Sequence, residues 1–196
     1  MKIGVISVQG AVPEHLRISQ MALSNMGRKG QTIAVRHRQE LRSLDCLIIP
    51  GGESTTISKL LRKFHLSEEI VDMGLRGVPI MGTCAGCVLL AKEGGEQAER
   101  TGMELLSLMD MAVDRNAFGR QRESFEAQLD IAGLDAPFPG VFIRAPLITK
   151  TWGECEVLCR HQGEAVMAKQ SNIIAVSFHP ELTADPRLHQ MLFSLV

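Results

Sequence analysis

The chain has 196 residues and a formal net charge of −1 at pH 7, with 45% hydrophobic and 22% charged residues. These values are ordinary for a globular protein with a buried core, and the length fits one domain, residues 1–196. A near-neutral charge and 4% aromatic residues argue against a surface that binds nucleic acid or an anionic membrane. No apolar run reaches the roughly 18 residues that span a bilayer. Five irregularly spaced cysteines fit a reducing compartment, so we expect a cytoplasmic protein.

The first part of the chain alternates short apolar strands with helices. Strands are predicted at residues 2–8, 33–35 and Cys46–Ile49. A helix is predicted over residues 13–26, because Pro13 costs no hydrogen bond in a first turn. After the third strand, Ser54 or Thr55 can cap the next helix.

The rest of the chain begins in the same way and then changes. An apolar strand at 79–81 precedes a predicted helix at 85–92, and an apolar strand at 173–178 precedes a closing helix at 186–196. Between them, shorter and partly antiparallel strands are predicted at 109–113, 124–131 and 140–143. Apolar strands that alternate with helices indicate a sheet covered on both faces. We therefore predict an α/β fold, a three-layer α/β/α sandwich with a mixed, mostly parallel central sheet and a site at the carboxyl ends of its strands.

Cys84 lies in GTCAG at 82–86, a G-x-C-x-G between a predicted strand and a predicted helix. This is the pattern of a nucleophile elbow with cysteine in place of serine, where small neighbours permit a sharp turn. The N–H groups that begin the helix would favour negative charge on the sulfur. Two alternatives remain: a buried structural cysteine, and, with Cys87, a C-x-x-C pair of the thiol–disulfide oxidoreductase kind.

His179 and Glu181 lie in SFHPE at 177–181, where the last predicted strand ends. In an extended chain, residues i and i+2 point to the same side. A cysteine nucleophile needs a base, and the base needs an acceptor that fixes its tautomer. The pair supplies both for Cys84 if the two strand ends are neighbours in the sheet. The alternative is a solvated polar turn.

PGGESTT at 50–56 follows the third predicted strand. Glycines let backbone N–H groups approach an oxygen closely, which suits an oxyanion hole. The peptide between Gly51 and Gly52 can turn either its N–H or its C=O towards such a site. A phosphate loop would need a following Gly-Lys-Ser/Thr, which is missing. A plain turn with a helix cap is the alternative.

Other candidate positions carry weaker signals. Cys155, Cys159 and His161 have C-x₃-C-x-H spacing but no fourth ligand nearby, so we expect no metal site. The remaining histidines are expected on helix or loop surfaces: His15, His37, His65 and His189.

PGGES, GTCAGC and SFHPEL, in this order, resemble the class I (triad) glutamine amidotransferases. The sequence is most similar to the glutaminase subunits of pyridoxal 5′-phosphate synthases, and this resemblance covers nearly the whole chain. It rests on IGVISVQGAVPEH, PGGESTT, GTCAGCVLLAKE, DRNAFGRQRESFEA, GVFIRAP and SFHPELTADPR. Departures are Cys87, where an apolar residue is expected, and residues 93–101, which carry no clear family signature.

The resemblance implies a class I glutamine amidotransferase-like, flavodoxin-like fold and a glutaminase that forms a γ-glutamyl thioester. Cys84 would be the nucleophile, His179 the base and acid, and Glu181 its orienting partner. Residues implied to bind L-glutamine are Gly52, Glu53, Ser54, Arg115, Ile143 and Arg144, and those of the oxyanion hole are Gly52 and Ala85. Arginine suits bidentate binding of the α-carboxylate, although surface salt bridges are the alternative for both arginines. The ammonia would pass to a synthase subunit that makes pyridoxal 5′-phosphate (vitamin B6), and no cofactor or metal is required.

Two other functions share part of this pattern. An amidotransferase subunit of another pathway, such as imidazole-glycerol-phosphate synthesis, would keep the triad but not GGESTT, NAFGRQ and FIRAP together. A catalytically dead binding module would usually lack the nucleophile or the histidine, and this chain has both.

Overall fold

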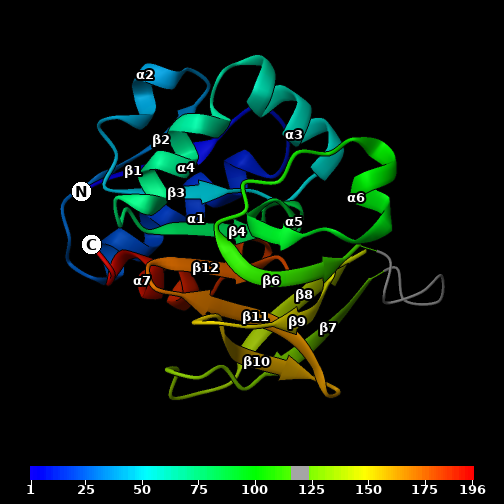
Figure 1. Ribbon diagram of the computed structural model, residues 1–196. Coiled ribbons are helices and arrows are strands. Elements are labelled where there is room, and N and C mark those ends of the chain that lie inside the picture. Colours follow the sequence, from blue (N-terminus) through cyan, green and yellow to red (C-terminus); the bar gives the residue numbers. More distant parts are fainter. Residues whose placement is uncertain (116–123) are drawn as a thin grey trace.

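A mixed β-sheet forms the centre of the protein (Figure 1). The computed structural model describes residues 1–115 and 124–196. In these residues the sheet has ten strands in the order β2-β1-β3-β4-β12-β11-β9-β6-β5, with β10 paired to β11. These strands are β1 (Lys2–Ile6), β2 (Gln31–Val35), β3 (Cys46–Ile49), β4 (Ile80–Thr83), β5 (Ala91–Glu93), β6 (Met109–Asp114), β9 (Leu147–Thr151), β10 (Glu156–His161), β11 (Glu164–Gln170) and β12 (Ile173–Val176). Two further strands, β7 (Ser124–Leu129) and β8 (Phe138–Ile143), form a separate antiparallel pair.

The two halves of the sheet differ in direction. From β2 through β1, β3 and β4 to β12, all neighbouring strands are parallel. This is the 2-1-3-4-5 order of flavodoxin-like folds, with β12 as the fifth strand. From β12 to β6 the neighbours are antiparallel, and only β5 is again parallel to its neighbour β6.

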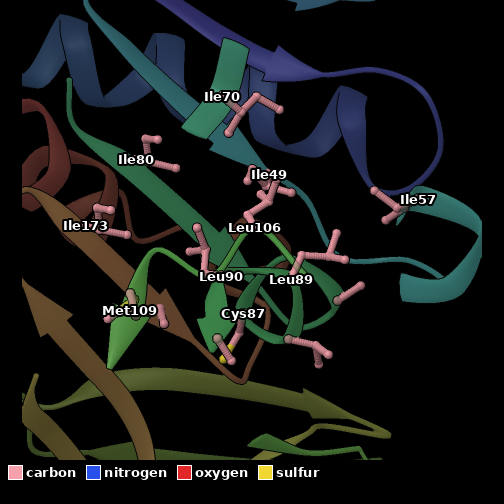
Figure 2. Close-up of a cluster of buried hydrophobic side chains, with 14 of the residues drawn as sticks. Ile49, Ile57, Ile70, Ile80, Cys87, Leu89, Leu90, Leu106, Met109 and Ile173 are labelled. Carbon is pink, nitrogen blue, oxygen red and sulfur yellow. The ribbon is translucent and has the colours of Figure 1, made fainter. Parts of the chain in front are cut away.

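Helices cover both faces of the parallel half, and the helix Gly95–Thr101 packs on β6 in the other half. They are α1 (Val12–Asn25), α2 (Arg38–Leu41), α3 (Ser54–Lys63), α4 (Ser67–Leu75), α5 (Ala85–Leu90), α6 (Gly95–Thr101) and α7 (Arg187–Phe193), with a 3₁₀ turn η1 (Pro180–Leu182). Strand side chains alternate between two hydrophobic clusters, as the period of two in a strand requires. Leu47 and Ile49 pack with α3, α4 and α5, whereas Cys46 and Ile48 pack with α1 and α7. Figure 2 shows the first cluster, where Leu89 and Leu90 of α5 lie near Ile49. The predicted three-layer sandwich is confirmed.

One predicted helix is wrong in extent, and some strands of the structure were not predicted. The helix predicted at 85–92 ends at Leu90, because Ala91–Glu93 forms β5 and pairs with β6. Strands β9, β10 and β11 were not predicted, since they mix polar and apolar residues without a clear alternation. The NAFGRQ motif at 116–121 lies outside the described residues. In the part of the chain that the structure describes, no helix is long and apolar enough to cross a membrane.

Candidate active site

The carboxyl ends of β1, β3, β4 and β12 meet at one edge of the sheet, because these strands are parallel neighbours. The segments that follow them border a cavity of about 390 Å³. Its lining residues are Gln9, Gly52, Glu53, Ser54, Cys84, Ala85, Val88, Arg115, Ile143, Arg144, Pro146 and His179. Of the predicted site residues only Glu181 is not in this lining; it lies behind His179 with no exposed surface. Gln9, Val88 and Pro146 were not predicted.

Cys84 occupies a strained turn between β4 and α5. Its backbone has φ 49° and ψ −102°, a conformation that residues other than glycine rarely adopt. Its N–H donates to the carbonyl of Val176 in β12 at 2.8 Å, which fixes the end of β4 against β12. The next helix packs closely on the sheet: a Cβ on Gly86 would overlap the carbonyl oxygen of Ile49. The turn therefore has the geometry expected of a nucleophile elbow.

His179 follows the end of β12, the strand that pairs with β4. Its Nδ1 lies 2.8 Å from Oε1 of Glu181. The two residues meet as predicted, but the expected extended run is wrong, because Pro180–Leu182 forms a 3₁₀ turn. The His179 N–H also donates to the carbonyl of Val141 in β8, at 2.8 Å. The bond to Val141 holds the backbone of His179, and the contact with Glu181 fixes the direction of its imidazole.

The surroundings of His179 favour its charged form. Burial opposes protonation, but hydrogen bonds with Cys84 and Glu181 outweigh it and raise the pKa of His179 to about 10. Since Nδ1 faces Glu181, Nε2 is the ring nitrogen left to face Cys84. The arrangement can therefore hold a proton between a sulfur and an imidazole.

The loop after β3 lies over this pair. A Cβ on Gly51 would be 2.5 Å from Cε1 of His179 and 3.3 Å from Cβ of Cys84, so only glycine fits there. The Gly51 carbonyl accepts a hydrogen bond from the N–H of Ala11 at 3.2 Å, and Gln9 Oε1 accepts from the Glu53 N–H at 2.9 Å. The segment between β1 and α1 thus holds the Gly51–Gly52 peptide with its carbonyl towards Ala11.

Glu53 and Arg115 form one wall of the cavity. The Glu53 carboxylate caps α3 by accepting from the N–H groups of Thr55 and Thr56, so the predicted Ser54 or Thr55 cap is wrong. Burial would raise its pKa, but these bonds and those to the Thr55 and Thr56 side chains lower the pKa of Glu53 to about 2. Arg115 pairs with Glu53 at 3.1 Å. Arg144 is exposed after β8 and has a φ of 43°.

Several other predictions concern residues away from the cavity. Cys87 belongs to the hydrophobic core and is fully buried (Figure 2), and burial raises the pKa of its thiol. Neither the described residues around Cys159 nor any others in 1–115 and 124–196 form a group that could hold a metal. His161 stacks on Phe125 and Phe142 instead.

Two histidines were placed wrongly by the sequence reasoning. His37 and His65 are exposed as expected, but His15 and His189 are fully buried. His15 lies beside Glu181, and His189 contacts His15. The helical spacing could have indicated that His15 is buried, because it shares one face of α1 with the apolar residues Ile18 and Ala22.

Comparisons with known proteins agree with this geometry. The model of the SNO glutamine amidotransferase family matches residues 5–196. A "Pyridoxal 5'-phosphate synthase subunit PdxT" of Methanosarcina barkeri is 52% identical over 97% of this chain and 95% of its own length. A protein of the same name from Thermococcus onnurineus is 48% identical over 97% of this chain and 96% of its own.

Solved structures show the same fold. The protein in "Crystal structure of glutamine amidotransferase" is 42% identical, with a TM-score of 0.88 over 98% of this chain and 97% of that one. A chain of "PurLQS from Thermotoga maritima" shares the fold at 15% identity, with a TM-score of 0.64 over 99% of this chain and 95% of that one. The matching family model and the full-length relatives establish the conclusion that this chain belongs to the SNO glutamine amidotransferase family.

Proposed function

We propose that this chain is the glutaminase subunit of a pyridoxal 5′-phosphate synthase, with Cys84, His179 and Glu181 as its catalytic triad in one domain, residues 1–196. The observation that carries the proposal is the position of His179. It lies beside Cys84 in the cavity wall, and its Nδ1 is hydrogen-bonded to Glu181. This is the order of nucleophile, base and orienting acceptor that amide hydrolysis needs.

The first half of the reaction releases ammonia. The Cys84 thiolate attacks the side-chain amide carbon of L-glutamine, and the carbonyl oxygen gains the negative charge. His179 then gives its Nε2 proton to the amide nitrogen as the C–N bond breaks. Ammonia leaves, a γ-glutamyl thioester remains on Cys84, and His179 becomes neutral.

The second half restores the enzyme. Neutral His179 removes a proton from water, the resulting hydroxide attacks the thioester, and the C–S bond breaks. Glutamate leaves and the thiolate–imidazolium pair forms again. Nucleophilic attack and proton transfer use Cys84, His179 and water, and Glu181 stabilises the charged imidazole in both halves.

The cavity lining supplies groups for the substrate. The backbone N–H groups of Gly52 and Ala85 would hold the oxyanion, and removing one such donor typically costs about 3 kcal/mol. Arg144, at the exposed edge, suits the α-carboxylate of glutamine. The other proposed substrate-binding residues are Gly52, Glu53, Ser54, Arg115 and Ile143.

The partner follows from the relatives and from the product. Relatives similar over the whole chain are named as subunits of pyridoxal 5′-phosphate synthase. Free ammonia is protonated and lost in water, so the enzyme serves a synthase subunit that combines it with a pentose phosphate and a triose phosphate. We place the complex in the cytoplasm, where reduced thiols persist; the five free cysteines of the chain support this.

The test compares two cysteines in the complex with the synthase subunit. Glutamate release should be lost in Cys84→Ala and kept in Cys87→Ala, because Cys87 lies in the core three residues away. Acid quenching of the unaltered complex with labelled glutamine should trap label on Cys84. A Cys84→Ala complex with normal turnover would reject the mechanism. Glutamate release without pyridoxal 5′-phosphate formation would reject only the pathway.

The free chain should hydrolyse glutamine slowly. The Gly51–Gly52 peptide has two accessible orientations, only one of which turns its N–H towards the oxyanion, and Ala11 holds its carbonyl in one of them. If the competent orientation is about 1% populated alone, synthase binding can raise turnover up to about a hundredfold. Equal glutamate release with and without excess synthase subunit would contradict this dependence.

A further inference from the structure

Behind the proposed triad lies a cluster of buried polar side chains that the mechanism above does not use. His15 comes from α1, His189 from α7 and Thr83 from the end of β4, and none of them is exposed. His15 Nδ1 lies 3.1 Å from His189 Nε2, and His15 Nε2 lies 3.1 Å from Thr83 Oγ1. The same Nε2 lies 3.4 Å from Glu181 Oε2. His15 therefore contacts both the residue before Cys84 and the carboxylate that orients His179.

The two oxygens of Glu181 have different surroundings. Oε1 faces His179 Nδ1 at 2.8 Å. Oε2 is buried and has no hydrogen-bond partner of good geometry within the described residues, and His15 Nε2 is the basic nitrogen that faces it. A buried carboxylate oxygen without a facing donor is costly. An N–H on His15 Nε2 would offset that cost, so the tautomer of His15 matters.

The tautomer follows from His189. Its Nδ1 is buried and has no partner in the described part of the chain. A buried N–H without an acceptor is rarer in proteins than an acceptor without a donor, so His189 carries its proton on Nε2. His189 Nε2–H then donates to His15 Nδ1, which must be unprotonated. Neutral His15 then has its proton on Nε2, which lies within hydrogen-bond distance of Thr83 Oγ1 and faces Glu181 Oε2 at 3.4 Å.

We propose that His15 is a positioning residue of the glutaminase reaction: its Nε2–H, fixed by His189, holds Glu181 in the orientation in which Oε1 accepts from His179. The inference rests on the proposed function. Because the same N–H contacts Thr83, His15 also links the strand end that carries Cys84 to the turn that carries Glu181.

The charge state of His15 fits this role. Burial, then His189, then His179 lower the pKa of His15 well below its ordinary value, and burial lowers the pKa of His189 to about 3. The groups that face His15 are His189, Thr83, Glu181 and, through space, His179. A neutral His15 orients Glu181 without neutralising it, so the carboxylate charge remains available to the His179 imidazolium.

Two substitutions separate positioning from packing. In His15→Gln the amide nitrogen can occupy the place of Nε2 and keep the donor towards Glu181. In His15→Asn the amide reaches only the place of Nδ1, so the contact with His189 remains and that with Glu181 is lost. Ser19→Ala is the matched control, because Ser19 is buried one turn later on α1 and its hydroxyl has no partner among residues 1–115 and 124–196.

The measurements are made on the complex with the synthase subunit. In His15→Asn we expect kcat for glutamate release to fall about tenfold with KM within about twofold, since the loss concerns proton transfer and not binding. The pH profile of the rate of Cys84 alkylation by iodoacetamide should shift to higher pH by about one unit, because a misplaced Glu181 stabilises the imidazolium less. His15→Gln and Ser19→Ala should retain the profile of the unaltered complex.

The alkylation profile keeps the inference separate from the proposed function, because it requires a thiolate and no turnover. Equal profiles in His15→Asn and His15→Gln would overturn the positioning role even if glutamine is the substrate. If His15→Asn fails to fold, His189→Phe replaces it. That variant removes the donor that fixes the His15 tautomer, and it should shift the profile in the same direction. An unshifted profile in a folded His189→Phe complex would also overturn the inference.

Discussion

Glu181 lies between two histidines with opposite properties. On the cavity side, His179 is held in its charged form, with its pKa raised to about 10. On the core side, His15 is held neutral, with its pKa well below the ordinary value. Burial opposes the charge on both rings. His179 overcomes it through hydrogen bonds to Cys84 and Glu181, whereas His15 contacts Thr83 and another histidine and meets Glu181 only at 3.4 Å.

This difference shows how one carboxylate can serve two unlike neighbours. Hydrogen-bond geometry, and not proximity alone, decides which ring carries the proton. The side with the better-placed acceptor is the one proposed to perform proton transfer, and the other side presents a neutral dipole. Three changes can break or sharpen the comparison.

The largest effect is expected on the cavity side. In the complex, His179→Ala should lower glutamate release by about 10³ or more, because the proposed base and acid of both half-reactions is removed. Glutamate release is measured with the synthase subunit in excess. His65→Asn is the control, because His65 is exposed, has a φ of 54° that asparagine tolerates, and lies outside the cavity. A His179→Ala complex within tenfold of the unaltered one would remove His179 from the chemistry.

A smaller effect is expected when Glu181 loses its charge and keeps its shape. Glu181→Gln retains an acceptor for His179 Nδ1 but no longer stabilises the imidazolium electrostatically, so kcat should fall about 10- to 100-fold. The pKa of His179 should fall as well. The ring signal followed by NMR against pH reports it directly. An unchanged titration of His179 would show that Cys84 alone maintains the charge.

The effect on stability is spread over several pH units, and it has opposite signs on the two sides. His189 has its pKa lowered to about 3, so the unfolded chain binds more protons, and stability falls as the pH drops from about 6.5 towards 3. His179 has its pKa raised to about 10, so its contribution is full below about 6.5 and is lost as the pH rises towards 10. Each slope can reach about 1.4 kcal/mol per pH unit.

Urea unfolding at several pH values measures both slopes. His189→Gln should lose part of the decline between about pH 6.5 and 5 and leave the alkaline side unchanged. His179→Gln should leave the acidic side unchanged and flatten the curve of stability against pH above about pH 7. Parallel curves for the two variants and the unaltered chain would contradict the assigned charge states.

The sequence predicted those parts of the fold where local pattern and tertiary role agree. The four-residue run Cys46–Ile49 was predicted with its bounds, because all four side chains are buried between two helical layers. The same holds for the turn at Cys84, where a nucleophile elbow allows only small neighbours. Strand β10 could not be found in this way, since Glu156–His161 carries charged residues on a strand that pairs with β11 to one side of the main strand order.

The candidate site divides along the same line. The cavity residues after β3, β4 and β12 were named from motifs that follow strand ends, and the parallel strands bring those ends together. Arg115, Ile143 and Arg144 come at the ends of β6 and β8, which lie outside the parallel half, and were named only from the family resemblance. Gln9 was missed as a wall residue, since its bond to the Glu53 N–H links segments that are 44 positions apart in sequence. Glu53 was not recognised as the cap of α3, because Ser and Thr are preferred caps and both follow it directly.

By itself, the sequence determined which reactive groups are present and where they lie in the fold. A cysteine occupies a tight elbow, a histidine and a glutamate follow a buried strand, and the α/β order places these two segments at one edge of the sheet. These features are local, and short-range sterics and hydrophobic period fix them. Only the tertiary structure decided the state of each group. His15 looks like a surface histidine until α7 covers α1, and Glu181 gains its second neighbour only when β4, α1 and η1 meet. Desolvation depends on everything packed around a group, so the charge state of each group in this site is set by the tertiary structure and cannot be read from a motif.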